Sequence, residues 1–507
     1  MIKRVFLFLY ILAFSVSVFG CSVAPSVDAE TGEFQVGYAI RDMMPNADLD
    51  KDGAIDPIPL GGYGNSAARL ADYSLCEEWD TLRTTCVAMT DAENNTVLMI
   101  SFDLLYTYEY LTEGVRNALN SMTGIPKNNI FINASHTHSG PDVTLSGNSV
   151  SRAYLKVVHE KTVEAALAAL EDRVPITGMF VGDTETDRMS FVRHIEQVEK
   201  DGDVVYCGDN FGTWLPVSTL KERVFAEEVD ETMHVLQFTR EGKADVVMVN
   251  WRAHPTLQGG IDDPLMTSDY VGTFRMAMED RGYCFAFYQG GAGNVNGYNN
   301  IAAPHRLGNK SQQQDGYVQF GAYLADHAEE AMENAKQVET GTIKTKQVQL
   351  AGQIDHSADY LYDIAVQVRD YFNEHAGEPD VRTEAKKIGE NYGVRSVYHA
   401  GAIITRTGLW DTLDLELDAV TIGHSLAITM APNELFCGST QWLEDQVAEQ
   451  GLYEMTFTLG YSNDALSYIP TQKAYDYTCY ESDVTRFVPG TGEVLQETLL
   501  EMLQQLH

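Results

Sequence analysis

Two histidines, His136 and His138, are the residues of this sequence whose types and spacing most clearly indicate chemistry. They follow an apolar run at residues 130–134 and precede a Gly140-Pro141 turn, so they stand where a strand would end. In an extended backbone, side chains at positions i and i+2 point to the same side. We therefore expect the two imidazoles to converge on one metal ion or one substrate. Two partly exposed imidazoles at a strand edge are the ordinary alternative.

A third histidine leaves another predicted strand in the same way. His254 follows the apolar residues 244–251 and precedes Pro255. A further strand at residues 283–288 leads into a glycine-rich turn at residues 289–297, where glycines allow the backbone to approach a ligand closely. The turn lacks the Lys-Ser/Thr pair of a phosphate-binding loop.

Three polar residues near the carboxyl end of the chain have both a functional and a structural interpretation. Glu434 follows Pro432-Asn433 and is predicted to lie in or near the first turn of a helix, a position that favours carboxylates. Tyr480 lies twelve residues beyond Tyr468. Each tyrosine taken alone is more typical of an amphipathic core residue.

The elements that must position these side chains alternate between strands and helices. Strands are predicted at residues 34–40, 84–89, 96–105, 176–182, 233–239, 342–350 and 415–422, and helices at residues 109–122, 151–170, 268–281, 311–336 and 383–390. This order predicts an α/β fold, in which one large catalytic domain has a mixed β-sheet core flanked by helices. Open sheets of this kind bind ligands at the carboxyl ends of strands, where the histidines are expected.

The amino-terminal residues have the pattern of an export signal. Lys3 and Arg4 precede an apolar run that ends before Cys21, which is too short for a stable membrane span. The sequence Val-Phe-Gly-Cys at residues 18–21 resembles a bacterial lipobox, which implies cleavage before Cys21 and lipid attachment to its sulfur. We expect residues 1–20 to be a signal peptide, residues 21–33 a tether and residues 34–507 the catalytic domain.

These features predict an exported protein that is lipid-anchored in the bacterial envelope and faces the periplasm or the cell surface. An ordinary signal peptide cut nearby is the alternative. The net charge is −38 with histidines neutral, and such a surface repels nucleic acid and anionic headgroups. No nucleic-acid partner is therefore predicted, and no protein partner is evident from the sequence. Six cysteines follow Cys21, which permits disulfides in an exported chain but also suits buried thiols.

An acidic segment before the first helix has part of a calcium-binding pattern. Asp48, Asp50 and Asp52 alternate and are followed by Gly53, as in the first half of an EF-hand loop. The second half does not match, because Pro59 occupies the position of the bidentate glutamate. A calcium site and an acidic solvated turn both remain open.

Five of these stretches together resemble the neutral/alkaline non-lysosomal ceramidase family. The matching motifs occur in the family's order, at residues 135–141, 250–256, 290–296, 432–434 and 463–471. The resemblance extends from about residue 36 to about residue 480. It implies a ceramidase-like fold and a single zinc ion whose ligands are His136, His254, Glu434 and Tyr468.

The resemblance also implies the catalytic roles of three further positions. His138 matches the histidine that faces the scissile amide, and Tyr480 matches the tyrosine that contacts the carbonyl oxygen. The substrate-binding arginine matches Arg193 best, with Arg188 as the second choice. Asp269 and Asn294 are candidates to orient a ligand imidazole, although Asp269 is equally suited to capping a helix.

Two departures from the family pattern bear on the substrate. Asn296 stands where ceramidases carry a serine, which excludes a serine acyl-enzyme at that position. Only 27 residues follow Tyr480, so we expect no carboxyl-terminal immunoglobulin-like domain.

The resulting hypothesis is a zinc-dependent hydrolase of a linear amide, such as an N-acyl sphingoid or a similar N-acyl lipid. Metal-activated water would attack the amide carbonyl. One alternative is a surface lipoprotein that has lost its chemistry and binds lipid or glycan. Another is a metal-dependent esterase or deacylase on a different acylated substrate.

Overall fold

The computed structural model describes residues 32–45, 48–49, 53–54, 56–63, 69–76, 80–144, 149–186, 189–198, 204–209, 224–225, 229–258, 263–297, 310–465, 467–477 and 479–507. The predicted signal peptide, Cys21 and all but the last two residues of the tether lie outside these ranges, as do Asp50, Asp52 and Arg188. None of the helices in the described ranges combines the length and the apolarity needed to cross a bilayer.

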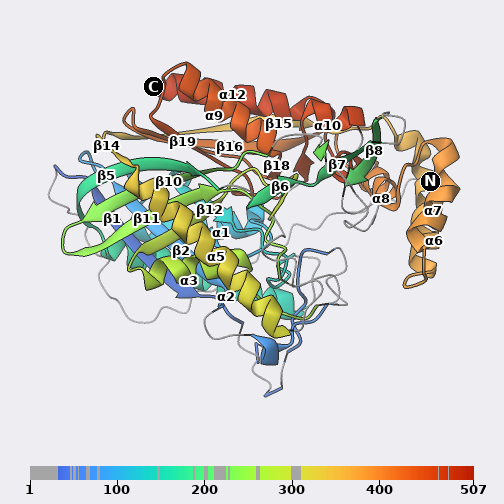
Figure 1. Cartoon of the computed structure of the whole chain (residues 1–507), viewed down its shortest axis with the longest axis horizontal. Helices are drawn as coiled ribbons and strands as arrows, with labels where there is room; N and C mark the ends of the chain where they lie inside the picture. Colours follow the sequence, from blue (N-terminus) through green and yellow to red (C-terminus); the bar gives the residue numbers. More distant parts are fainter. Residues whose placement is uncertain are drawn as a thin grey trace.

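A mixed sheet of nine strands forms the larger of two stacked sheets (Figure 1). Eight strands follow one another in the order β12-β11-β10-β5-β1-β2-β3-β4, and β14 pairs with the edge of β5. Their bounds are β12 Cys284–Gln289, β11 Lys243–Trp251, β10 Thr232–Arg240, β5 Val174–Glu185, β1 Gln35–Asp42, β2 Arg83–Thr90, β3 Thr96–Phe102, β4 Ile130–Ala134 and β14 Lys336–Val338. Every residue of β3 and β4 is buried, as continuous apolar strands require when both faces of a sheet are covered.

A second sheet of four strands lies on one face of the first. Its order is β15-β16-β17-β19, with bounds β15 Ile343–Gln353, β16 Thr412–Ile422, β17 Leu426–Met430 and β19 Met455–Leu459. One apolar core lies between the two sheets, where Met99 and Leu236 of the larger sheet and Val420 and Ile428 of the smaller sheet belong to the same buried cluster. Packing of one sheet on another is therefore the centre of the molecule.

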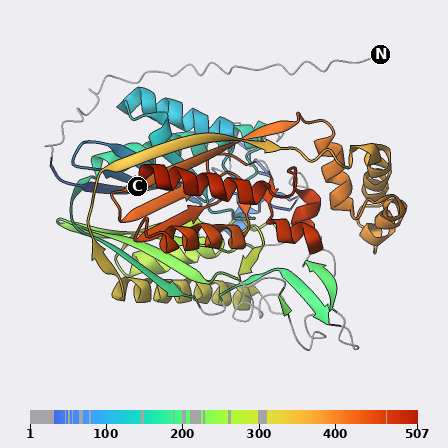
Figure 2. The same cartoon turned by 90° about the horizontal axis from the view of Figure 1, so that it is seen from above.

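Helices cover the outer faces of both sheets, so the molecule has four layers. The larger sheet is covered by α1 Glu109–Thr123, α2 Ser149–Glu171, α3 Tyr270–Asp280 and α5 Lys310–Glu333. The smaller sheet is covered by α9 Cys437–Glu449 and α12 Thr491–Leu506, which lie along it in the view from above (Figure 2). The α/β architecture with helices flanking a mixed sheet is thus confirmed.

A helical insertion projects at one end of the molecule between β15 and β16 (Figure 1). It consists of α6 Tyr362–Glu374, α7 Val381–Gly389 and α8 Val397–Arg406, which enclose a small apolar core of their own. The sequence pattern predicts only one helix here, at residues 383–390. The helices α6 and α8 were not predicted, because the many charged residues of the insertion obscure the short apolar face of each helix in the sequence pattern.

Within the two stacked sheets, three pairs of neighbouring strands are parallel, namely β3 with β4, β11 with β12, and β17 with β19. Both members of a parallel pair end at the same edge of their sheet. The loops after these carboxyl ends carry most of the predicted site residues. The fold therefore supports the expected location of the site at strand ends.

Candidate metal centre

His136 lies two residues beyond the end of β4, with a backbone φ of +68°. The extended backbone that the spacing predicts is therefore wrong at this residue. The turn is held by hydrogen bonds to the loop after β3: the His136 backbone N–H donates to the Leu104 carbonyl at 3.0 Å, and the ring Nδ1 donates to the Leu105 carbonyl at 2.7 Å. The convergence of the rings is nevertheless correct, because the centroids of His136 and His138 are 4.9 Å apart.

His254 follows β11 and is fixed by the glycine-rich turn after β12. Its Nδ1 donates to the carbonyls of Ala292 at 2.7 Å and Val295 at 3.0 Å. Gly293 permits this close approach, since a Cβ atom there would lie 2.6 Å from the carbonyl oxygen of Glu434. The turn therefore brings His254 and Glu434 to the same place.

Glu434 reaches the two histidines from the segment that follows β17 of the smaller sheet. Its Oε2 lies 3.3 Å from Nε2 of His136 and 3.2 Å from Nε2 of His254. The hydroxyl of Tyr106 donates to Oε1 of Glu434. The side chains of Glu434 and of both histidines are at most 2% exposed. Residues from three distant parts of the chain thus meet in one buried cluster.

Glu434 lies near the start of a helix, as expected, but not in its first turn. Glu434 begins the short strand β18 (Glu434–Leu435), and α9 begins at Cys437. β18 pairs in parallel with β20 (Tyr468–Ile469), where Tyr468 is the partner of Glu434. The Glu434 backbone N–H donates to the Ser467 carbonyl at 3.2 Å. In the first turn of a helix this N–H would have no backbone partner and would need a capping group.

The hydrogen bonds of the cluster leave an arrangement that could hold a cation. A backbone carbonyl only accepts, so Nδ1 of His136 and of His254 must each carry the proton, and Nε2 of a neutral ring then has a lone pair. Burial, together with Arg193, lowers the pKa of His254 to about 4. Burial alone would raise the pKa of Glu434, but the two histidines hold it well below its usual range. Three acceptor atoms therefore face one another.

This donor set fits zinc. Two imidazole nitrogens and one carboxylate oxygen are three of the ligands that zinc prefers, and three protein ligands leave room for water or substrate. The Nδ1 bonds to carbonyls and the Tyr106 bond to Glu434 are the supporting contacts that usually orient zinc ligands. The roles of these residues as ligands remain predictions.

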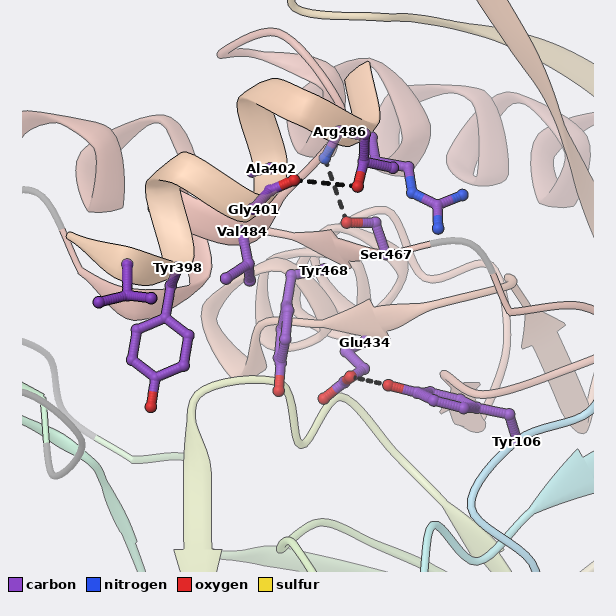
Figure 3. A pocket seen from close by; sticks show the side chains of 11 residues that line it. Tyr106, Tyr398, Gly401, Ala402, Glu434, Ser467, Tyr468, Val484 and Arg486 are labelled. Carbon is purple, nitrogen blue, oxygen red and sulfur yellow. Dashed lines mark hydrogen bonds between the residues drawn. The ribbon is translucent and has the colours of Figure 1, made fainter. Parts of the chain in front are cut away.

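Tyr468 lies beside this cluster. Its hydroxyl and the Glu434 carboxylate end side by side in Figure 3, as expected for partners in neighbouring strands. Nη2 of Arg193 donates to the hydroxyl at 3.4 Å. Burial raises the pKa of Tyr468 well above its usual value, so the phenol is protonated at neutral pH. Its predicted role as a fourth ligand is geometrically compatible with this position.

His138 stands at the open side of the histidine pair. Its Nε2 is 3.2 Å from Nε2 of His136, and among the described residues its Nδ1 has no hydrogen-bond partner. Burial and the neighbouring His136 and His254 keep the pKa of His138 well below its usual value. Nitrogen atoms of all three rings lie within 4.8 Å of one another, so His138 can reach whatever these two histidines bind.

Arg193 follows β6 (Ser190–Val192) and is fully buried. Its Nε donates to Glu481 at 2.5 Å, its Nη2 donates to the Gly293 carbonyl at 2.7 Å, and its Nη1 lies 3.4 Å from Nε2 of His254. The guanidinium is therefore held beside the cluster by contacts with Glu481, Gly293 and His254. The predicted contact with substrate remains a prediction.

Tyr480 begins the short helix α11 (Tyr480–Val484) and packs edge-on between two other tyrosines. Its ring centroid is 5.8 Å from Tyr468 and 4.9 Å from Tyr398. Tyr398 belongs to α8, so Tyr480 connects the cluster to the helical insertion. Its predicted contact with a carbonyl oxygen is not tested by this geometry.

The residues predicted to orient a ligand imidazole have other contacts. Asp269 caps α3, since its carboxylate accepts from the Tyr270 N–H at 2.7 Å and the Gln258 N–H at 2.6 Å, which is the capping alternative. The side-chain oxygen of Asn294 accepts from the Cys437 N–H at 3.0 Å and so fixes the start of α9. Asn296 lies in β13 (Val295–Gly297), and its backbone bridges to His254.

The structure describes only part of the segment that was predicted to bind calcium. Asp48 accepts a hydrogen bond from the Gly53 N–H at 3.1 Å, whereas Asp50 and Asp52 lie outside the described residues. A calcium site at this segment stays a prediction.

Three residues of the site were not predicted. Tyr106 follows the end of β3, and the rule that parallel strands deliver ligands at their carboxyl ends could have found it. Tyr461 packs its ring 4.3 Å from that of His136, and Glu481 binds both Arg193 and His194. Neither Tyr461 nor Glu481 has a sequence signal, because their contacts join residues hundreds of positions apart.

A pocket of about 400 Å³ opens from the cluster toward the helical insertion (Figure 3). Glu434, Tyr106 and Tyr468 lie at one end of it. The wall formed by α8 is mostly apolar or small, and it consists of Val397, Tyr398, Gly401, Ala402 and Thr405. An elongated apolar group can therefore extend along α8 while a polar group reaches Glu434.

The fold and the site define a four-layer α/β protein with a buried His/His/Glu cluster at the carboxyl ends of parallel strands. The neutral ceramidase of Pseudomonas aeruginosa has a similar structure, with a TM-score of 0.68 at 16% sequence identity, covering 94% of this chain and 74% of that chain. A ceramidase complexed with C2 gives a TM-score of 0.65 at 17% identity, covering 94% and 75%. The ceramidase-like fold implied by the motifs is thus confirmed. No protein-family model and no curated protein sequence matches the chain.

Proposed function

We propose that this protein is a zinc-dependent hydrolase that cleaves a linear amide in an N-acyl lipid. The observation that carries the proposal is the convergence of Glu434 Oε2 with Nε2 of His136 and Nε2 of His254. This buried set of acceptors lies at the end of a pocket with an apolar wall. The fold shared with solved ceramidases supports the same reaction class.

The residues around the cluster divide the chemical tasks. Zinc bound by His136, His254, Glu434 and Tyr468 would polarise the substrate carbonyl and lower the pKa of water toward about 7. His138 is neutral, and its Nδ1 has no hydrogen-bond partner among the described residues. The ring can therefore accept a proton from water and return it to the leaving amine. Tyr480 can donate a hydrogen bond to the negative oxygen that develops on the carbonyl. Burial excludes bulk water and strengthens these interactions.

The test is metal analysis and hydrolysis by the purified full chain. We expect about one zinc per chain, because the residues form a single site with three or four ligands. We also expect the protein to release laurate from an N-lauroyl sphingoid amide. His254→Ala should lose both the metal and the activity, whereas His375→Ala, at the partly exposed residue that follows α6, should lose neither. Full activity in metal-free protein would refute the proposal.

We also propose export and lipid attachment at Cys21, on the lipobox resemblance alone. Growth of cells expressing the protein with labelled palmitate should label the wild type but not Cys21→Ser. Equal labelling of both would contradict the anchor and would leave the hydrolase proposal untouched.

A further inference from the structure

Arg486 is a basic residue of the pocket that the proposed reaction does not use. It lies between α11 and α12, and its backbone is fixed on both sides: the N–H donates to Ser467 Oγ at 3.1 Å, and the carbonyl accepts from the Asp355 N–H at 2.9 Å. Its side chain lines the pocket together with Glu434 and Tyr106. In Figure 3 the guanidinium extends from this fixed backbone away from α8.

The guanidinium of Arg486 has no partner among the residues that the structure describes, since it forms neither an ion pair nor a hydrogen bond there. Arg486 is partly buried. Most of the fully buried arginines are paired with carboxylates: Arg116 with Glu416, Arg193 with Glu481, Arg252 with Asp230, Arg275 with Asp103 and Arg406 with Asp355. Arg69 differs, since it donates to backbone carbonyls and to Ser139. Burying a cation without a partner is costly. The position is therefore suited to an anion that comes with a ligand.

The carboxylate of Asp464 accepts hydrogen bonds from other groups. Asp464 acts on the charge of Arg486 from a distance, but its Oδ1 accepts from the backbone N–H groups of Ala465 at 2.7 Å and Glu109 at 3.2 Å. The phenols of Tyr106 and Tyr108 also act on the charge of the guanidinium. A phenol is a weak partner for a cation compared with a carboxylate, which an arginine binds through two parallel hydrogen bonds.

We infer that Arg486 binds an acidic group of the substrate, so that the preferred substrates are N-acyl compounds with an anionic head, such as N-acyl amino acids. This inference rests on the proposed hydrolase function. The acyl chain would lie along α8, the amide would lie at Glu434 and the carboxylate would pair with Arg486. The oxygen of water then bonds to the carbonyl carbon and the C–N bond breaks, and both protons of water go to the nitrogen, giving a fatty carboxylate and an amino acid with an ammonium group.

The experiment compares two probes that differ only in the head group, N-lauroylglycine and N-lauroylethanolamine. We expect the zinc-loaded wild type to cleave the glycine conjugate with a kcat/KM about tenfold or more higher, the value of a charge-assisted hydrogen bond. In Arg486→Gln the ratio should fall to near one, and Arg486→Lys should keep part of it, because it retains the charge but not the planar fork. Arg369→Gln, which removes an exposed arginine of α6, should keep the wild-type ratio.

The outcomes separate this inference from the proposed function. Equal cleavage of both probes by the wild type, or an unchanged ratio in Arg486→Gln, overturns the role of Arg486 and leaves the hydrolase standing. If neither probe is cleaved, calorimetric binding of N-lauroylglycine decides the matter. Binding that weakens at least tenfold in Arg486→Gln supports the anion site even without hydrolysis, and equal binding overturns it.

Discussion

Hydrogen bonds between side chains and backbone determine the chemistry of the candidate centre at the scale of single residues. The carbonyls of Leu105, Ala292 and Val295 accept hydrogen bonds from Nδ1 of two histidines. The Nε2 lone pairs of these histidines therefore point into the cluster. The hydroxyl of Tyr106 similarly donates a hydrogen bond to one oxygen of Glu434. Each supporting contact therefore orients one ligand candidate rather than contributing a ligand itself.

Tyr106→Phe should weaken zinc binding about tenfold to a hundredfold, because it removes the hydrogen bond that orients Glu434. Competition with a chelating dye measures the zinc Kd directly. Tyr108→Phe is the matched control, since Tyr108 stacks on Tyr110 and does not contact Glu434. Equal zinc affinity in all three proteins would contradict the orienting role of Tyr106.

Glu481→Gln should destabilise the protein by about 3 to 5 kcal/mol, because it leaves the guanidinium of Arg193 buried without a carboxylate. Urea denaturation gives the free energy of unfolding. Glu384→Gln, which removes the exposed partner of Lys387, should change it by about 0.5 kcal/mol or less. A similar small effect for both variants would show that the buried pair is not important for stability.

The same carboxylate predicts a dependence of stability on pH. Burial alone would raise the pKa of Glu481, but Arg193 and His194 lower it to about 2. The folded state therefore binds fewer protons than the unfolded state between the ordinary glutamate pKa, about 4.5, and 2. The stabilisation from Glu481 is fully present above this interval and is lost as the pH falls through it. Glu481→Gln should lack this part of the acid destabilisation in urea curves measured from pH 5 to pH 2.

At the scale of elements, parallel strand pairs and one inserted helix build the site. The pairs β3/β4, β11/β12 and β17/β19 each end in a loop that carries site residues. The insertion contributes α8, which forms the apolar wall of the pocket. The strands therefore position the reactive groups, and the helix determines how much space a substrate has.

Gly401→Leu should lower kcat/KM for a long-chain amide while raising helix stability. A Cβ atom at Gly401 would meet no heavy atom within 4 Å, so a larger side chain projects into the pocket without a clash. Replacing a helical glycine stabilises by roughly 0.5 to 1 kcal/mol. Gly401→Ala should give the same rise in stability with a smaller loss of activity. Unchanged activity in Gly401→Leu would show that substrate does not lie along α8.

At the scale of the whole molecule, the centre joins the two stacked sheets. His136 and His254 follow strands of the nine-stranded sheet, and Glu434 follows the four-stranded sheet. A metal bound by all three would link the layers directly, whereas without a cation three buried acceptors face one another at the junction. Metal binding should therefore be coupled to the stability of the whole fold.

Chelation should lower the Tm of the wild type by a few degrees, and added zinc should restore it, because a ligand at 100 times its Kd stabilises the folded state by about 2.7 kcal/mol. Differential scanning fluorimetry with and without chelator measures the shift. His254→Ala should show no such shift. A wild-type Tm that is insensitive to chelator and zinc would contradict a link between the sheets.

The sequence by itself determined the helices and strands with strong periodicity, and the histidines at strand ends. Local patterns are sufficient for this, because burial on one or both faces of an element directly constrains neighbouring side chains. The five ordered motifs also predicted the fold. The left-handed backbone of His136 and the strand that begins at Glu434 were mispredicted, since tertiary hydrogen bonds override local preference there.

The motif resemblance predicted that His136, His254, Glu434 and Tyr468 meet, but only the tertiary structure decided through which contacts distant residues do so. The pairing of Glu434 with Tyr468, the ion pair between Arg193 and Glu481, and the unpaired guanidinium of Arg486 all depend on how the two sheets and the insertion pack. Local periodicity carries no information about such contacts, because the partners lie from tens to hundreds of residues apart in the chain.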